Sequence, residues 1–239
     1  MSASAADVAY HGIRRMLSSG ELVPGQRLSQ SRLARQLQCS PMPVVEAMRR
    51  LESEGLLDKQ PRKQARVRML SRSDLDGLYL LREALETVIA RLAAERITPE
   101  ESRELQELAQ AHERAWEVVQ HESEADVAIH RHIARCARCP LLQGELERFR
   151  LIELTAGRHL RPKQTRPGHP HIHRALVQAI IDHDSASAEY LMKKHIQNGY
   201  EEAQREFDAH LENLPKTSRN THRKARRHEA PGMSPEKLN

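Results

Sequence analysis

Residues 39–57, CSPMPVVEAMRRLESEGLL, contain the start, the apolar face and the end of one short helix. Ser40 suits the N-cap, and Pro41 suits the first helical position, where a missing N–H is not needed. Apolar residues then recur at helical spacing, and Gly55 is typical of the turn that ends a helix. The stretch therefore predicts an amphipathic helix whose first two turns hold no cation.

The sequence on either side of this helix predicts a winged helix-turn-helix within residues 1–70, which we call the head. Residues 29–38, SQSRLARQLQ, form a shorter amphipathic pattern with Ser29 as its N-cap. Residues 56–70, LLDKQPRKQARVRML, look like two short strands around a basic turn. In such a fold the second helix enters the major groove of DNA by its N-terminal end, and the hairpin reaches a phosphate or the minor groove.

Charge is distributed unevenly along the chain. Residues 1–70 hold 12 Lys and Arg against 6 Asp and Glu, residues 71–212 hold 19 against 25, and residues 213–239 hold 7 against 2. A basic head on an acidic body favours a head that faces a polyanion such as nucleic acid. Chance variation between modest domain charges is the alternative.

The remaining sequence predicts an all-α antiparallel helical bundle over residues 71–209, followed by a basic disordered tail over residues 210–239. Aromatic residues make up 3% of the chain, too few for a typical β-sandwich core. Thr98 and Glu101 have the spacing of a capping box. The fold class is therefore mainly α, a winged helix-turn-helix followed by a bundle. Its helices are expected at residues 73–97, 98–120, 122–136, 140–160, 170–183 and 185–208.

Other compositional features favour a cytoplasmic protein. No apolar run approaches the length of about 18 residues that a transmembrane helix needs. Residues 1–16 lack the apolar core of a signal peptide. Cys136 and Cys139, in the sequence CARCP, would need two further ligands to hold zinc, so a structural role is favoured over a metal or redox site.

One carboxylate and three histidines have spacings that could bring them together. Asp126 and His130 lie four residues apart, on one face of a helix. His173 and His195, 22 residues apart, would both face inward if two consecutive helices pack antiparallel. Such donors suit Zn²⁺, Ni²⁺, Co²⁺ or Mn²⁺, with Zn²⁺ favoured, and ordinary polar contacts are the alternative. His112 is expected at the surface.

The sequence GELVPGQRLSQSRLARQLQCSPMPVVEAMRRLESEGLL, residues 20–57, resembles the N-terminal domain of GntR-type bacterial transcription regulators. In that family an Arg usually follows the capping Ser, another precedes the Glu-Ala pair, and the wing usually carries a Gly. This sequence has Pro41, Val45 and Gln64 there. An Arg binds guanine through a bidentate fork, which Pro and Val cannot replace.

The resemblance implies DNA contacts from the head, with Met42 and Val44 as candidates to touch a thymine methyl group. Two interpretations stay open: an operator that depends less on guanine, or a head that has lost specific binding. The candidate DNA-binding residues are Arg32, Ser40, Met42, Val44, Arg49, Arg50, Arg62 and Lys63.

Residues 78–86, LYLLREALE, and the spacing of the four candidate ligands resemble the FCD-type ligand-sensing bundle found behind GntR-type heads. In that bundle, an Asp, a His one turn later and two further His line a metal site, and small carboxylic acids often bind beside the metal. The resemblance gives those roles to Asp126, His130, His173 and His195. Arg82 is then a candidate to bind the effector carboxylate, and an ion pair with Glu86 is the alternative.

The resemblance as a whole implies a homodimeric DNA-binding transcription regulator, not an enzyme. Its partners would be a double-stranded operator and a small organic acid, and it would associate with the nucleoid when bound to DNA. A metal-dependent hydrolase that uses the Asp and three His is the rival interpretation. Glu124 and Glu153 are near those ligands in sequence only. A metal bundle that senses nothing organic is a second rival.

Overall fold

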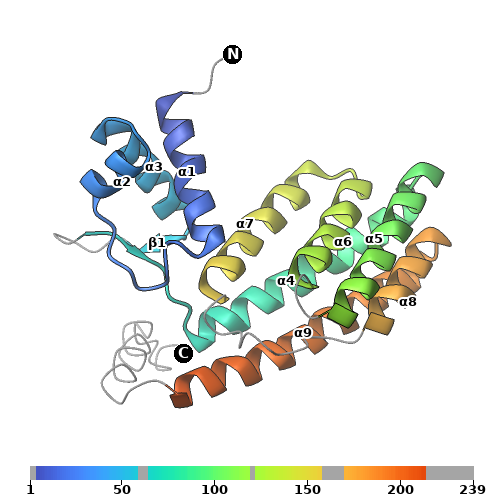
Figure 1. Ribbon diagram of the computed structural model, residues 1–239. Helices are drawn as coiled ribbons and strands as arrows, with labels where there is room; N and C mark the ends of the chain where they lie inside the picture. Colours follow the sequence, from blue (N-terminus) through green and yellow to red (C-terminus); the bar gives the residue numbers. More distant parts are fainter. Residues whose placement is uncertain (1–3, 59–63, 119–121, 158–169, 214–239) are drawn as a thin grey trace, which may run out of the picture.

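The computed structural model of the chain describes residues 4–58, 64–118, 122–157 and 170–213. The head contains α1 (Ala5–Ser19), α2 (Gln30–Gln36), α3 (Pro41–Ser53), β1 (Leu57–Asp58) and β2 (Arg66–Val67). The bundle contains α4 (Arg72–Arg96), α5 (Pro99–Val118), α6 (Glu122–Cys136), α7 (Pro140–Gly157), α8 (Pro170–Ile181) and α9 (Ser185–Asn213). The mainly α fold class, with a winged head and a helical bundle, is confirmed (Figure 1).

The head has the short helices and the hairpin that the sequence predicts. β1 and β2 pair antiparallel, with Leu57 opposite Val67. The Ser29 side chain accepts a hydrogen bond from the Arg32 N–H and so caps α2. Ser40 is the N-cap of α3 by position, without a side-chain capping bond. The Ser29 cap fixes where α2 starts, and Pro41 at the first helical position marks the start of α3.

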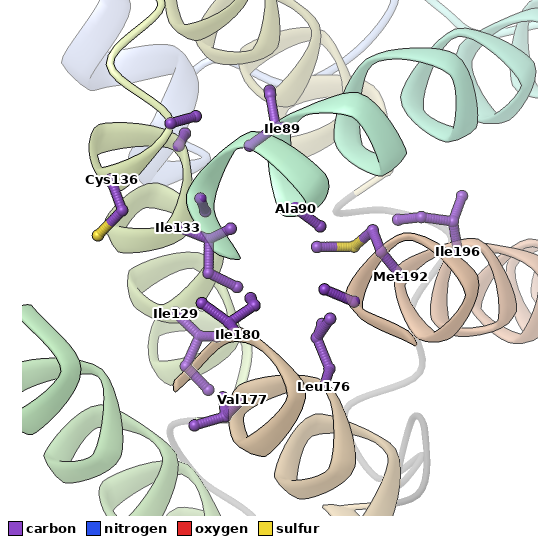
Figure 2. Packing of buried hydrophobic residues seen from close by; sticks show 14 of the residues in the cluster. Ile89, Ala90, Ile129, Ile133, Cys136, Leu176, Val177, Ile180, Met192 and Ile196 are labelled. Atoms are coloured by element: carbon purple, nitrogen blue, oxygen red, sulfur yellow. The ribbon is translucent and has the colours of Figure 1, made fainter. Parts of the chain in front are cut away.

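The bundle is built around two long helices, α4 and α9, which pack along each other (Figure 1). Branched and small side chains from α4, α6, α8 and α9 fill the space between them (Figure 2). Ile133, Leu176 and Ile180 are fully buried there. Because burying apolar surface is the main favourable term in folding, this core fixes the relative positions of the helices that carry the candidate ligands.

Two corners of the bundle show how its helices are joined. The Glu101 N–H donates to Thr98 Oγ1 over 3.3 Å and the Thr98 N–H donates to Glu101 Oε2 over 2.9 Å, which is the expected capping box. At the α6–α7 corner, Arg138 donates to the Arg96 carbonyl and to the Glu101 carboxylate. Cys136 is buried beside this corner, and burial raises the pKa of its thiol to about 11, which makes it unreactive.

The helix ends differ from the sequence prediction by a few residues. α8 ends at Ile181 because His183 takes a left-handed conformation with φ of 57°. α9 continues past residue 208, because Phe207 is buried and Asp208 pairs with Arg72 of α4 at 2.6 Å. The expected disordered tail lies outside the described residues from position 214 onward. None of the helices in the described ranges is long and apolar enough to cross a bilayer.

Apolar residues from two bundle helices pack into the core of the head. Leu151 and Ile152 of α7 and Leu78 of α4 belong to the head's buried cluster rather than to the bundle's. In Figure 1, α7 lies between the head and the other bundle helices. Arg68, just after β2, also pairs with Asp74 in the first turn of α4. A movement of α4 or α7 would therefore change the packing of these residues against the head.

Candidate functional site

Asp126, His130, His173 and His195 converge inside the bundle, and one donor atom from each lies within 4.8 Å of the others. The His173 Nε2 is 2.9 Å from Asp126 Oδ1. The His130 Nε2 is 2.9 Å from the His195 Nε2 and 3.4 Å from Asp126 Oδ1. Three imidazole Nε2 atoms thus turn toward one carboxylate oxygen, and we call this group the polar cluster.

Three helices supply the polar cluster. Asp126 and His130 are one turn apart on α6. His173 lies in the first turns of α8 and His195 lies in α9, and the two helices are joined by a tight turn. In this turn the Asp184 N–H donates to the Ala179 carbonyl over 2.9 Å, which returns the chain alongside α8. The juxtaposition that the sequence spacing predicted for these four residues is present.

Burial and neighbouring charges set the protonation of the polar cluster. Burial raises the pKa of Asp126, but the positive charges of His130 and His173 outweigh it and hold that pKa well below its usual value. Burial lowers the pKa of His195 well below its usual value, and nearby His173 and His130 add to this. His130 differs, because burial lowers its pKa but the charges of Glu86 and Asp126 outweigh this and raise it. The cluster therefore holds an ionised carboxylate and a neutral His195, the forms that bind a metal ion, and a bound metal would displace a proton from His130.

The donor set fits a divalent transition metal. Three imidazole nitrogens and one carboxylate oxygen are ligands that Zn²⁺ and its neighbours accept. His130 and His173 are buried, while Asp126 and His195 are half-buried. A bound cation would replace the close contacts between imidazole nitrogens, which are otherwise crowded around a single carboxylate oxygen.

A buried carboxylate, Glu86 of α4, lies directly behind the polar cluster and was not identified as a site residue from the sequence. It accepts hydrogen bonds from His130 Nδ1, from Arg82 Nε at 2.8 Å and from Arg150 Nη2 at 3.2 Å. Burial raises the pKa of Glu86, but the charges of Arg82, His130 and Arg150 outweigh it and hold that pKa well below the usual value. Glu86 is therefore an anion with 1% exposure.

Arg82, the candidate effector-binding residue, makes an ion pair with Glu86. This is the alternative role for Arg82 that the sequence alone had left open. Its side chain is 10% exposed, and its guanidinium carbon lies 5.1 Å from the centre of the Tyr79 ring. Its positive charge also contributes to lowering the pKa of His195, after the larger effects of burial and of the neighbouring histidines. Arg82 is thus close to the polar cluster as well as paired with Glu86.

His112 of α5 is a correction to the sequence prediction, which expected it at the surface. It is 2% exposed, because α5 packs against α6 and α8 with this side chain inward. Its ring centre lies 4.4 Å from that of His173, and burial lowers its pKa to about 4. Among the described residues, the His112 Nδ1 has no hydrogen-bond partner. A single histidine with no ligand spacing around it gives no sequence signal for this position.

The DNA-facing surface of the head is less basic than the family pattern. Met42, near the start of α3, is 72% exposed, and Ser40, Arg32 and Arg49 are also exposed. Val44 is fully buried in the head core, so the expectation that it touches a thymine methyl is wrong. Helical periodicity turns that side chain inward while Met42, two positions earlier, faces out.

Arg50 has intramolecular partners. Its guanidinium lies 3.3 Å from Asp7 and 3.5 Å from Glu54, and its carbon is 3.8 Å from the centre of the Tyr10 ring. These contacts tie α3 to α1, so a phosphate would compete with them for Arg50. Arg62 and Lys63, the candidate wing cations, lie outside the described residues.

Comparison with known proteins matches both parts of the chain. Residues 5–67 match bacterial regulatory proteins of the gntR family, and residues 77–198 match the FCD domain. The chain is 38% identical over 105 residues to the HTH-type transcriptional regulator McbR of Escherichia coli (strain K12), which covers 44% of this chain and 48% of McbR. It is 33% identical over 92 residues to the uncharacterized HTH-type transcriptional regulator YdhC of Bacillus subtilis (strain 168), covering 38% of this chain and 41% of YdhC.

A solved structure titled E. coli McbR/YncC has the same arrangement of helices. It superposes with a TM-score of 0.74 at 25% sequence identity, over 86% of this chain and all of that one (100%). By sequence, in contrast, the matched regions span about half the length of these curated relatives. The HTH-type transcriptional repressor RspR of Escherichia coli (strain K12) matches over more of the chain, at 24% identity over 194 residues, 79% of this chain and 84% of RspR.

Proposed function

This chain belongs to the gntR family of bacterial regulatory proteins that carry an FCD domain, and from that premise we propose that it is a DNA-binding transcription regulator whose bundle binds a divalent metal and a small carboxylic acid. The observation that carries the proposal is the convergence of Asp126, His130, His173 and His195 in a bundle. Two helices of that bundle, α4 and α7, pack apolar residues into the core of the winged head. Metal and acid would together set the affinity of the head for its operator.

The metal would be held by Asp126 Oδ1 and by the Nε2 atoms of His130, His173 and His195. Zn²⁺ is the favoured ion, and Ni²⁺, Co²⁺ and Mn²⁺ suit the same donors. When bound, the metal supplies a positive centre to which an organic carboxylate can coordinate. Around it, Asp126 balances part of the charge and the buried histidines limit access of water.

Arg82 is the proposed contact for the effector carboxylate. Its charge acts on His195, so it is near enough to the polar cluster to attract an anion bound there. Its Nε already donates to Glu86, so an effector would share this guanidinium with Glu86. An acid that binds would therefore alter the Arg82–Glu86 ion pair, which gives effector binding a direct consequence inside the bundle.

The head would bind a pseudo-palindromic operator in the cytoplasm as part of a homodimer. Arg32 and Arg49 supply exposed cations for phosphates, and Ser40 and Met42 lie where the N-terminus of α3 would meet base edges. Arg62 and Lys63 are proposed as wing contacts on their sequence position. With Pro41 and Val45 in place of arginines, recognition would depend less on guanine.

The hydrolase alternative is set aside, because the matched families and relatives are transcription regulators and not enzymes. A bundle that holds metal for stability alone would have a distinct signature. It would gain stability from metal and none from added acids.

A zinc titration tests the metal proposal. Chelator competition should give one tight Zn²⁺ site per chain for the unaltered protein. His173→Ala and His195→Ala should each weaken it by at least about tenfold, because each removes one of four ligands. His11→Ala, at an exposed histidine of α1, is the matched control and should leave the affinity unchanged. Equal Zn²⁺ affinity in all four proteins would remove the polar cluster as the site.

A further inference from the structure

The carboxylate of Glu86 on α4 has partners on three helices, α4, α6 and α7. Its Oε2 faces the Nδ1 of His130 on α6 and, at 3.2 Å, the Nη2 of Arg150 on α7. Its Oε1 accepts from Arg82, one turn earlier on α4. A carboxylate with 1% exposure would be strongly destabilising without such partners, so the position is held by these contacts.

The contact with Glu86 orients the His130 ring. An ionised carboxylate can only accept, so the N–H of His130 lies on Nδ1. Its Nε2 then points into the polar cluster, 3.4 Å from Asp126 Oδ1 and 2.9 Å from the His195 Nε2. A carboxylate behind a histidine ligand fixes the tautomer and the ring orientation and makes the opposite nitrogen a better metal ligand.

Arg150 connects this carboxylate to the head. Its side chain is 6% exposed, and the next two residues on α7, Leu151 and Ile152, are buried in the head's apolar cluster. Ile152 also lies beside Gly55, immediately after α3. One helix therefore carries both the partner of Glu86 and an apolar residue near the C-terminal end of α3. Figure 1 shows α7 alongside α1 of the head.

We propose that Glu86 is a positioning residue for the metal site, and that its ion pair with Arg150 transmits metal occupancy along α7 to the head. The proposal rests on the proposed metal site. A divalent cation on the far side of His130 strengthens the attraction between His130 and Glu86 and repels Arg150. Glu86 then shifts its hydrogen bonding toward His130, and α7 responds where it packs against the head.

The test measures Zn²⁺ affinity and DNA affinity separately on the full chain. Zn²⁺ affinity comes from chelator competition. DNA affinity is measured on a duplex from the protein's own upstream region. The coupling ratio is the DNA affinity of the Zn²⁺-loaded protein divided by that of the metal-free protein. Glu86→Gln should lose about 10- to 100-fold in Zn²⁺ affinity, as expected for a residue that orients a ligand. Arg150→Gln should lose less Zn²⁺ affinity than Glu86→Gln, and its coupling ratio should fall to near one.

Arg148→Gln is the matched control, because Arg148 lies on the same helix with its side chain 44% exposed and pairs with Glu145. It should keep both the Zn²⁺ affinity and the coupling ratio of the unaltered protein. If Arg150→Gln keeps the full ratio, or Glu86→Gln binds Zn²⁺ normally, the inference is overturned. If the unaltered protein binds no Zn²⁺, the proposed metal site itself has failed.

A spectroscopic measurement on the unaltered protein guards against a variant that does not fold. In histidine-labelled protein loaded with Zn²⁺, nitrogen NMR should show His130 protonated at Nδ1 and metal-bound at Nε2. The opposite arrangement, with metal at Nδ1, would exclude Glu86 as the positioning group. Glu86→Asp adds a second check, since it keeps the charge but draws it back from His130 and should still weaken Zn²⁺ binding.

Discussion

Side chains close together on α3 differ in exposure, and this determines which of them can contact DNA. Met42 is exposed and Val44 is buried, although the sequence presents both as apolar residues near the start of the same helix. Arg49 and Arg50 are both exposed, but Arg50 also contacts Asp7 and Tyr10 of α1. The surface that meets DNA is therefore narrower than the list of basic and apolar residues on α3.

A pair of substitutions separates the two apolar positions. Val44→Ala should lower the free energy of unfolding by about 2 kcal/mol, because it removes buried methyl groups and leaves a cavity. Met42→Ala should change stability by less than about 0.5 kcal/mol, as expected at an exposed position, and should weaken binding to the native operator. Urea denaturation and fluorescence anisotropy check the two effects. Similar stability losses in both variants would contradict the assigned orientations.

The two neighbouring arginines should also differ. Arg49→Ala should weaken DNA binding at all sequences and reduce the slope of log affinity against log salt by about 0.9, the value for one lost phosphate contact. Arg50→Ala should instead lower stability, by about 0.5 to 1 kcal/mol for the loss of its contact with Tyr10. Anisotropy over a salt series and thermal melts distinguish them. A larger salt-slope change in Arg50→Ala would reverse the assignment.

At the scale of elements, helix ends and corners place the sites. The caps at Ser29 and Thr98 could be predicted from sequence, because capping depends on residues within one turn. The final turns of α9 could not, because they depend on Asp208 reaching Arg72 across the bundle. His112 and Glu86 were missed for the same reason: their roles come from neighbours on other helices.

Asp74, in the first turn of α4, should contribute to the loss of folding stability at acid pH. Burial raises the pKa of Asp74, but hydrogen bonds from Ser71 and the charge of Arg68 outweigh it, so this pKa lies below its ordinary value. The carboxylate therefore stabilises the fold fully above the pKa of the unfolded chain, near 4, and this contribution disappears as pH falls through the lower folded value.

The variant Asp74→Ala measures that contribution. At pH 7 it should lower the free energy of unfolding by about 1 kcal/mol, the usual effect of losing a helix-capping side chain. The difference from the unaltered protein should shrink as the pH is lowered below about 4, because the Asp74 carboxyl of the unfolded chain takes up a proton before that of the folded protein. Urea denaturation at several pH values provides the comparison. A difference that stays constant down to pH 3 would mean that the charge of Asp74 contributes nothing.

At the scale of the whole molecule, apolar residues of two bundle helices join the bundle to the DNA-binding head. Leu78 on α4 and Leu151 and Ile152 on α7 are buried with residues of the head. The sequence predicted the two parts and their order, but an interface of this kind depends on contacts between distant segments. The polar cluster was predicted from the four-residue spacing of Asp126 and His130 and the 22-residue spacing of His173 and His195, together with the resemblance of this pattern to the FCD-type bundle.

Removing metal should destabilise the whole protein. At a free Zn²⁺ concentration 100 times its dissociation constant, binding would add about 2.7 kcal/mol to stability, so a chelator should lower the melting temperature clearly. Adding small carboxylic acids to the Zn²⁺-loaded protein should raise it further if the bundle senses an acid. A chelator effect with no response to any acid would favour metal with a structural role only. The variant His195→Ala should show a smaller chelator shift than the unaltered protein at the same Zn²⁺ concentration.

The most direct test of the account is DNA binding with and without metal. Affinity for a duplex from the protein's own upstream region would be compared with that for a scrambled duplex, across a salt series, for Zn²⁺-loaded and metal-free protein. The account predicts a preference for the native duplex that persists at physiological salt and changes with metal. Equal and steeply salt-dependent binding to both duplexes, unaffected by metal, would indicate phosphate attraction alone and contradict the account.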